Sequence, residues 1–197
     1  MSMSAHSDAP PRAAHRPSAR EAMLAAAEAH LGADGALTLD SAARAAGVTK
    51  PGLMYHFATK EALLEALLDR IAARYEREML ALIGARHGGE VQDFAEVPAV
   101  PRHLAYLEWA ASAELSAADL VMVADPKLRV GLTERWQHQL ERWLEVPEST
   151  PAARRSRMLA VRLLADGLWF DRASGLLETV PGEELLALAL EMLGDES

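Results

Sequence analysis

Apolar residues recur along most of the chain at the three- and four-residue spacing of amphipathic helices, and no segment shows the alternation of a half-buried strand. The pattern therefore predicts an all-α protein. The expected helices cover residues 18–32, 39–47, 49–57, 60–85, 102–115, 126–146, 150–174 and 182–193. Residues 1–17 lack the periodicity and are rich in Ala, Pro, Ser and His, so we expect a flexible N-terminal arm there.

Turn and cap residues mark the boundaries of the expected helices in the first part of the chain. Residues with a side-chain oxygen that can cap a helix precede three of the expected helices: Thr38, Thr49 and Thr59. Gly47 can take a positive φ in the short turn between residues 39–46 and 49–57. Two short helices joined by a tight turn that contains Gly form a helix-turn-helix, whose second helix enters the major groove of DNA.

The second short helix, within VTKPGLMYHF (residues 48–57), therefore supplies the candidate DNA contacts. Its apolar positions Val48, Leu53 and Phe57 share an inward face. The Lys60 ammonium and the free amides of the following helix could hold one phosphate together. The candidate DNA-binding residues are Thr38, Thr49, Lys50, Pro51, Gly52, Tyr55, His56 and Lys60. We place a helix-turn-helix domain at residues 18–62 and a second helical domain at residues 63–197.

The run TLDSAARAAGVTKPGLMYHFATKEALLEALL, residues 38–68, resembles the DNA-binding head of the TetR family of bacterial transcriptional regulators. The positions that match the family pattern are Val48, Leu53, His56, Phe57 and Lys60. The chain departs from it at Met54, where the family usually has a phosphate-contacting Tyr. Tyr55 stands next in line, and we expect it to take over part of that contact.

The resemblance implies that the second domain dimerises and encloses a small-molecule pocket, and that a two-fold dimer reads a near-palindromic operator. The candidate pocket residues are the large side chains and one histidine of the middle helices: His103, Tyr106, Trp109, Met122, Trp136, Trp143 and Phe170. The candidate dimer-interface residues lie on the last two helices: Leu163, Leu164, Leu168, Trp169, Leu185, Leu186, Leu188, Ala189 and Met192. Packing within the chain's own core is the alternative role for both groups.

Charge and composition narrow the function further. The formal net charge is −9, but residues 1–60 carry six Lys and Arg against five Asp and Glu, so the acidic excess lies in the rest of the chain. This balance is unlike that of a protein that coats nucleic acid, yet it permits a compact DNA-binding head, because phosphate contacts are local. The sequence has no Cys, no apolar run of membrane-spanning length and no signal-peptide pattern, which fits a cytoplasmic protein.

We find no motif that indicates an enzyme, such as a metal-binding His-Glu-x-x-His, a Gly-rich phosphate loop or a Gly-x-Ser-x-Gly. We therefore expect no catalytic residues, no metal and no cofactor. The sequence predicts a homodimeric DNA-binding transcriptional regulator, most simply a repressor, that an unidentified small molecule releases from its operator. The alternative is a helical protein-interaction module with a degenerate DNA-binding head.

Overall fold

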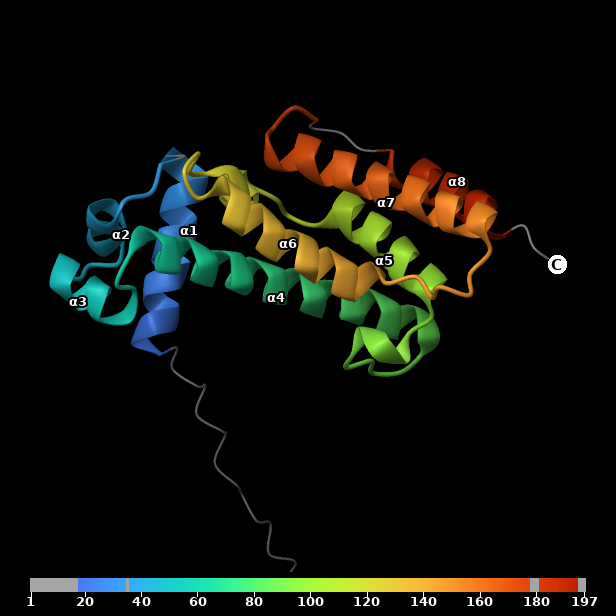
Figure 1. The fold of residues 1–197 in the computed structure, drawn as a ribbon, viewed down its shortest axis with the longest axis horizontal. Coiled ribbons are helices and arrows are strands. Elements are labelled where there is room, and N and C mark those ends of the chain that lie inside the picture. Colours follow the sequence, from blue (N-terminus) through green and yellow to red (C-terminus); the bar gives the residue numbers. More distant parts are fainter. Residues whose placement is uncertain (1–17, 35, 178–180, 195–197) are drawn as a thin grey trace, which may run out of the picture.

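The computed structural model describes residues 18–34, 36–177 and 181–194, and every regular element within those ranges is a helix (Figure 1). The α-helices are α1 (Ala19–Asp34), α2 (Leu39–Ala45), α3 (Lys50–His56), α4 (Lys60–His87), α5 (Ala99–Ser112), α6 (Arg129–Leu144), α7 (Ala152–Ala173) and α8 (Gly182–Gly194). Two 3-10 helices accompany them, η1 (Phe94–Glu96) and η2 (Ala117–Val123). The predicted all-α fold class is confirmed, and the predicted N-terminal arm lies outside the described residues.

Helices α1, α2 and α3 and the start of α4 form one end of the molecule, which we call the head (Figure 1). A predicted threonine caps each of α2, α3 and α4. Thr38 Oγ1 accepts from the Ser41 backbone N–H at 3.0 Å, and Thr59 Oγ1 accepts from the Ala62 N–H at 3.1 Å. Gly47 has a φ of 67°, a conformation that costs other residues about 1–2 kcal/mol. Local chemistry therefore sets the helix-turn-helix.

The helices α5, α6, α7 and α8 form the second part, which we call the body, and the 28-residue α4 runs from the head into it. At 1.5 Å per residue, α4 is about 42 Å long. Helix α5 lies at the centre of the body, where it packs against α4, α7 and α8. The predicted domain boundary after residue 62 falls inside α4, so one continuous helix carries both parts.

Several helix ends differ from the expectations. Gly32 lies inside α1, where an added Cβ would come 3.3 Å from Ser116 Oγ, so this glycine permits a close approach and does not end the helix. Helix α5 begins at Ala99, with Pro101 in its first turn, where a missing amide costs little. The sequence pattern also missed η2, because its short 3-10 turns lack the α-helical period.

Candidate functional site

The two faces of α3 separate as its sequence predicts. Leu53 and Phe57 are fully buried against the rest of the head. Lys50 and Pro51 are exposed at the start of the helix, and the Tyr55 side chain is 86% exposed. The face of α3 that points away from the core therefore presents a cation, an apolar ring and a phenol to any bound partner.

Tyr55 carries a hydrogen-bond donor that Met54 lacks. The Met54 side chain is 40% exposed and has no group that donates to a phosphate. Tyr55 is far more exposed, and its ring meets the His56 ring edge-on, with the ring centroids 5.1 Å apart. His56 is half-buried, and the Tyr55 O–H is a group that can donate to a phosphate or to a base edge.

Two of the candidate residues have a structural task at the start of α3. Thr49 Oγ1 accepts a hydrogen bond from the Gly52 backbone N–H at 3.2 Å, so its oxygen caps the helix. A Cβ added at Gly52 would lie 3.2 Å from that oxygen, which explains a small residue at this position. Thr49 and Thr38 are both exposed, and their hydroxyl hydrogens can still donate to a phosphate.

Both lysines of the predicted DNA-binding set are paired with a carboxylate. Lys50 Nζ lies 2.8 Å from Asp40 Oδ2 on the neighbouring α2, and both side chains are exposed. Lys60 Nζ lies 2.6 Å from Asp125 Oδ2, in the segment that joins η2 to α6. Neither acid was predicted from the sequence. The spacing of the helix-turn-helix could have suggested Asp40, but no local signal points to Asp125, which is 65 residues away from Lys60.

The structure places most of the predicted pocket residues in the core. The buried ones are His103, Tyr106, Trp109, Met122, Trp136 and Trp143. The Trp136 ring stacks on Trp169, with centroids 5.6 Å apart, and meets Trp143 and Tyr75 edge-on at 5.7 and 5.8 Å. These rings fill the space between α4, α6 and α7 by contact with each other. Phe170 differs, since its side chain is 47% exposed.

The polar atoms of this core have partners from distant elements. The Tyr106 hydroxyl donates to Asp166 Oδ1 at 2.7 Å, and burial together with that carboxylate raises the pKa of Tyr106 well above its ordinary value. His103 Nδ1 lies 2.8 Å from the Ala99 carbonyl oxygen. Burial lowers the pKa of His103, and the nearby guanidinium groups of Arg102 and Arg162 lower it further. The histidine is therefore a neutral core residue at neutral pH.

Asp119 in η2 is the most buried carboxylate of this region and was not predicted from the sequence. Its side chain is 1% exposed, and its Oδ1 accepts from both Arg74 Nη2 and the Tyr75 hydroxyl at 2.5 Å. Its Oδ2 accepts from the Ser116 backbone N–H at 2.6 Å. Burial, followed by the Asp119 charge, raises the pKa of Tyr75 well above its usual range. Asp119 thus fixes η2 to α4.

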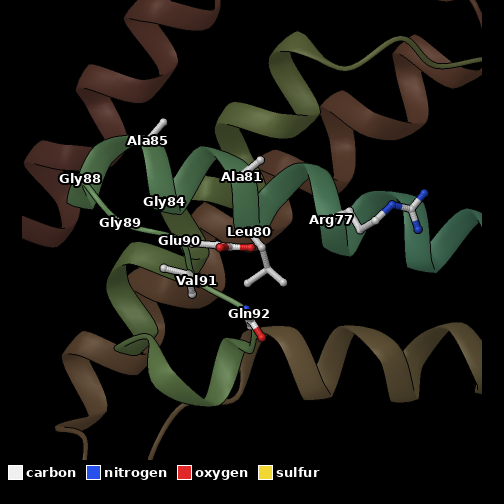
Figure 2. Close-up of a pocket in the computed structure, with 10 residues that line it drawn as sticks. All are labelled: Arg77, Leu80, Ala81, Gly84, Ala85, Gly88, Gly89, Glu90, Val91 and Gln92. Carbon is white, nitrogen blue, oxygen red and sulfur yellow. The ribbon is translucent and has the colours of Figure 1, made fainter. Parts of the chain in front are cut away.

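A cavity of about 690 Å³ lies at the far end of α4, between that helix and the segment of residues 88–92 (Figure 2). Leu80 and Val91 give it apolar walls, and Arg77 and Glu90 provide charged groups at its edge. An added Cβ at Gly84 would lie only 2.7 Å from the Gly89 carbonyl oxygen. Glycine at position 84 therefore lets the chain fold back over the helix end and form one wall of the cavity.

The predicted interface residues divide into three groups. Leu163 and Leu188 are exposed, with 59% of the Leu163 side chain accessible. The half-buried residues are Leu164, Leu185, Leu186 and Met192. The buried ones are Leu168, Trp169 and Ala189. The last three belong to the core of this chain, where the Trp169 indole N–H donates to the Tyr75 hydroxyl at 3.1 Å.

Among the helices of the described ranges, none is long and apolar enough to cross a membrane. In the same part of the chain, no group of three or more His, Cys, Asp or Glu side chains is placed to hold a metal ion.

Comparison with known proteins agrees with this architecture. Residues 23–67 match the family model described as bacterial regulatory proteins of the tetR family. The fold is similar to the crystal structure of a protein from Rhodococcus sp. assigned to the TetR-family transcriptional regulators, with a TM-score of 0.57 and 18% sequence identity. That likeness covers 90% of this chain and 98% of the other. No curated protein matches the sequence. The family match thus identifies residues 23–67, within the head, as a domain of the kind found in bacterial regulatory proteins of the tetR family, and the likeness over the rest of the chain is one of fold.

Proposed function

We propose that the chain is a repressor that occupies a near-palindromic operator as a homodimer and leaves it when a small molecule binds the body. The observation that carries the proposal is the arrangement of α3, which buries Leu53 and Phe57 and presents Lys50, Pro51 and Tyr55 outward. A helix held in this way by a helix-turn-helix can enter the major groove with its N-terminal residues at the base edges. The alternative, a protein-interaction module, gives no reason for the outward placement of Lys50, Pro51 and Tyr55 on α3.

We assign separate tasks to the candidate DNA contacts. Lys50 and Pro51, at the start of α3, are best placed for base edges, since a lysine can bind guanine and an apolar ring can contact a thymine methyl group. Tyr55, His56 and Lys60 are proposed to contact phosphates and so to position α3 without reading the sequence.

The proposed dimer uses an apolar stripe on α7, formed by Leu159, Leu163, Gly167 and Phe170. The three apolar side chains are exposed, and the spacings of four, four and three residues place all four positions on one helical face. An added Cβ at Gly167 would touch nothing within 4 Å, so this position leaves room for a partner helix to approach. Together with Leu188 on α8, the stripe could form a four-helix interface with its two-fold copy.

The cavity at the end of α4 is our candidate site for the effector (Figure 2). Its volume falls in the usual range of about 300–1,000 Å³ for small-molecule sites. Apolar walls with Arg77 and Glu90 at the edge suit an amphipathic molecule that carries a polar or charged group. A ligand there would contact α4, the helix that also carries Lys60. A shift of α4 on ligand binding would therefore reach the head.

The first test of the DNA-binding role is fluorescence anisotropy against the DNA that flanks the protein's own gene, with unrelated DNA as the control. We expect tight, salt-dependent binding to the flanking DNA. Lys60→Ala should weaken binding to both DNAs alike and lower the salt slope by about one, because it removes one phosphate contact. Arg155→Ala, which removes one positive charge on α7, is the charge-matched control.

The same titration separates the two candidate functions. A loss with Lys60→Ala that is confined to one operator sequence would contradict the phosphate role of Lys60. Equal and salt-insensitive behaviour of the wild-type protein with both DNAs would favour the protein-interaction module.

The dimer is tested by sedimentation velocity at micromolar concentration. We expect a dimeric wild-type protein, and Leu163→Glu should give monomers, because two buried carboxylates would face each other across the two-fold axis. Val130→Glu places the same charge at an exposed apolar position on α6 and should leave the dimer intact. A wild-type monomer would remove the support for a two-fold operator.

A further inference from the structure

A row of ion pairs joins α4 to the segment that contains α6. Asp69 pairs with Arg135, and two turns further along both helices Glu76 pairs with Arg142. In these pairs α4 supplies the acid and α6 supplies the arginine. The pair at the head end has the opposite polarity, because α4 supplies the cation Lys60 and the segment before α6 supplies Asp125.

The reversed pair is also the most enclosed of the row. The Asp125 side chain is only 16% exposed and that of Lys60 is 34% exposed, whereas Asp69 and Arg135 are both 46% exposed. Asp125 Oδ2 receives the Lys60 ammonium at 2.6 Å, while Oδ1 accepts from the Lys127 backbone N–H at 2.8 Å. The hydrogen bond from the ammonium holds the pKa of the Asp125 carboxyl below its ordinary value. The carboxylate is thus charged and fixed by its own turn.

A carboxylate and a phosphate oxygen compete for the same ammonium group, since both are anionic acceptors of charge-assisted hydrogen bonds. We propose that Asp125 is an internal competitor for DNA phosphate at Lys60. The head then gains its full affinity for the phosphate backbone of DNA only when the Lys60–Asp125 ion pair opens. The proposal rests on the proposed DNA-binding function. It adds a residue outside the helix-turn-helix and 65 positions from Lys60 in the sequence that sets how strongly the head holds DNA.

The position of Asp125 is tied to the inside of the body. It follows η2 by two residues, and η2 is anchored by the buried Asp119 to Arg74 and Tyr75 of α4. Tyr75 in turn accepts from Trp169 of α7. A change in the packing of these buried groups would therefore displace η2, and with it the carboxylate that restrains Lys60.

The test uses a labelled duplex of mixed sequence, because contacts to phosphate do not depend on the operator. Asp125→Asn keeps the shape of the side chain and an oxygen that can accept from Lys127, but it removes the charge. We expect it to tighten DNA binding roughly two- to fivefold at low salt, in line with the loss of one competing ion pair. The gain should shrink as the salt concentration rises.

Two further variants show whether the gain acts through Lys60. In a Lys60→Ala background, Asp125→Asn should give no gain, because the competed cation is absent. Asp69→Asn removes an equal charge from the same row of ion pairs, but its partner Arg135 is not a DNA contact, and it should leave affinity unchanged. An equal gain from Asp125→Asn in both backgrounds, or from Asp69→Asn, would show a general charge effect and overturn the proposal.

A measurement without DNA completes the test. If the pair exists in the free protein, the Tm shifts of Lys60→Ala and Asp125→Asn should fail to add in the double variant. Additive shifts would overturn the proposal. Binding by the wild-type protein with no gain from Asp125→Asn would overturn the competitor role alone. If neither the wild-type protein nor any variant binds the duplex, the proposed DNA-binding function fails, and the competitor role fails with it.

Discussion

The head and the body of this molecule are held together by contacts of very different range. In the head, each cap joins residues three apart, as in Thr38 to Ser41, and one glycine sets the turn between α2 and α3. In the body, the polar contacts that fix the helices join distant residues, such as Tyr106 to Asp166 and Trp169 to Tyr75. The head is therefore specified by short sequence motifs, whereas the body exists only when remote helices meet.

This difference shows which functional residues can be predicted from the sequence and which require the tertiary structure. A site built from local motifs is specified by a short stretch of sequence, so α3 is recognisable from the sequence alone. A regulatory contact between distant elements, such as Lys60 with Asp125, leaves no such trace. Substitutions of graded severity can test the contrast.

The largest effect is expected in the body, from Trp136→Ala. The Trp136 ring contacts three other aromatic rings and is almost fully buried, so its loss should lower the free energy of unfolding by about 3–5 kcal/mol. Urea unfolding measures the change. Gln137→Ala, at the next and exposed position of α6, is the control and should stay within about 0.5 kcal/mol of the wild type. A cost below about 1 kcal/mol for Trp136→Ala would mean that this region is a loosely filled cavity.

An intermediate effect is expected in the head, from Gly47→Ala. The φ of 67° is unfavourable for Ala, so the substitution should cost about 1–2 kcal/mol and weaken DNA binding through α3. Gly131→Ala is the matched control, because Gly131 lies in α6 with open space around an added Cβ and the change should stabilise by about 0.5–1 kcal/mol. Thermal unfolding should therefore show opposite signs for the two variants. A neutral Gly47→Ala would contradict the assigned turn.

A smaller, pH-dependent effect is expected from His103. Its pKa is lowered in the folded state by burial, so the unfolded chain binds more protons below the ordinary histidine pKa of about 6.5. Stability is then full above that pKa and falls as the pH drops below it, by up to about 1.4 kcal/mol per pH unit.

The measurement is urea unfolding at about pH 7.5 and about pH 5.5, which span the histidine transition. His103→Gln should lose less stability between the two pH values than the wild type does, whatever its absolute stability. His138→Gln removes an exposed histidine from α6 and is the control. An identical pH dependence for His103→Gln and the wild type would show that His103 is not held neutral in the folded protein.

The sequence predicted well those parts of the fold that depend on neighbours along the chain. The threonine caps, the turn at Gly47 and the inward face formed by Leu53 and Phe57 all lie where the pattern placed them. The exposure of Tyr55 also agrees with its predicted position on α3. Each of these features follows from helical periodicity or from a backbone group that one nearby side chain can satisfy.

The aromatic residues of the body show why the sequence could not decide between a ligand pocket and a filled core. The sequence places Trp136 and Trp143 on the inner face of one helix, but an inner face can line a pocket or fill a core. Which of the two occurs depends on whether Tyr75 and Trp169 arrive from other helices to occupy the space, and they do. The same uncertainty applied to Leu168 and Ala189, which the structure buries within the chain.

The sequence alone determined the all-α class, the helix-turn-helix and the match of the head to the tetR family model, because caps, glycine turns and helical periodicity act over a few residues. Only the tertiary structure decided which apolar side chains remain exposed on α7, where the cavity beside α4 lies, and which acid faces Lys60. The physical reason is the range of the interactions. A hydrogen bond within one helical turn is fixed by spacing in the chain, whereas the Lys60–Asp125 pair depends on how two distant segments pack against each other.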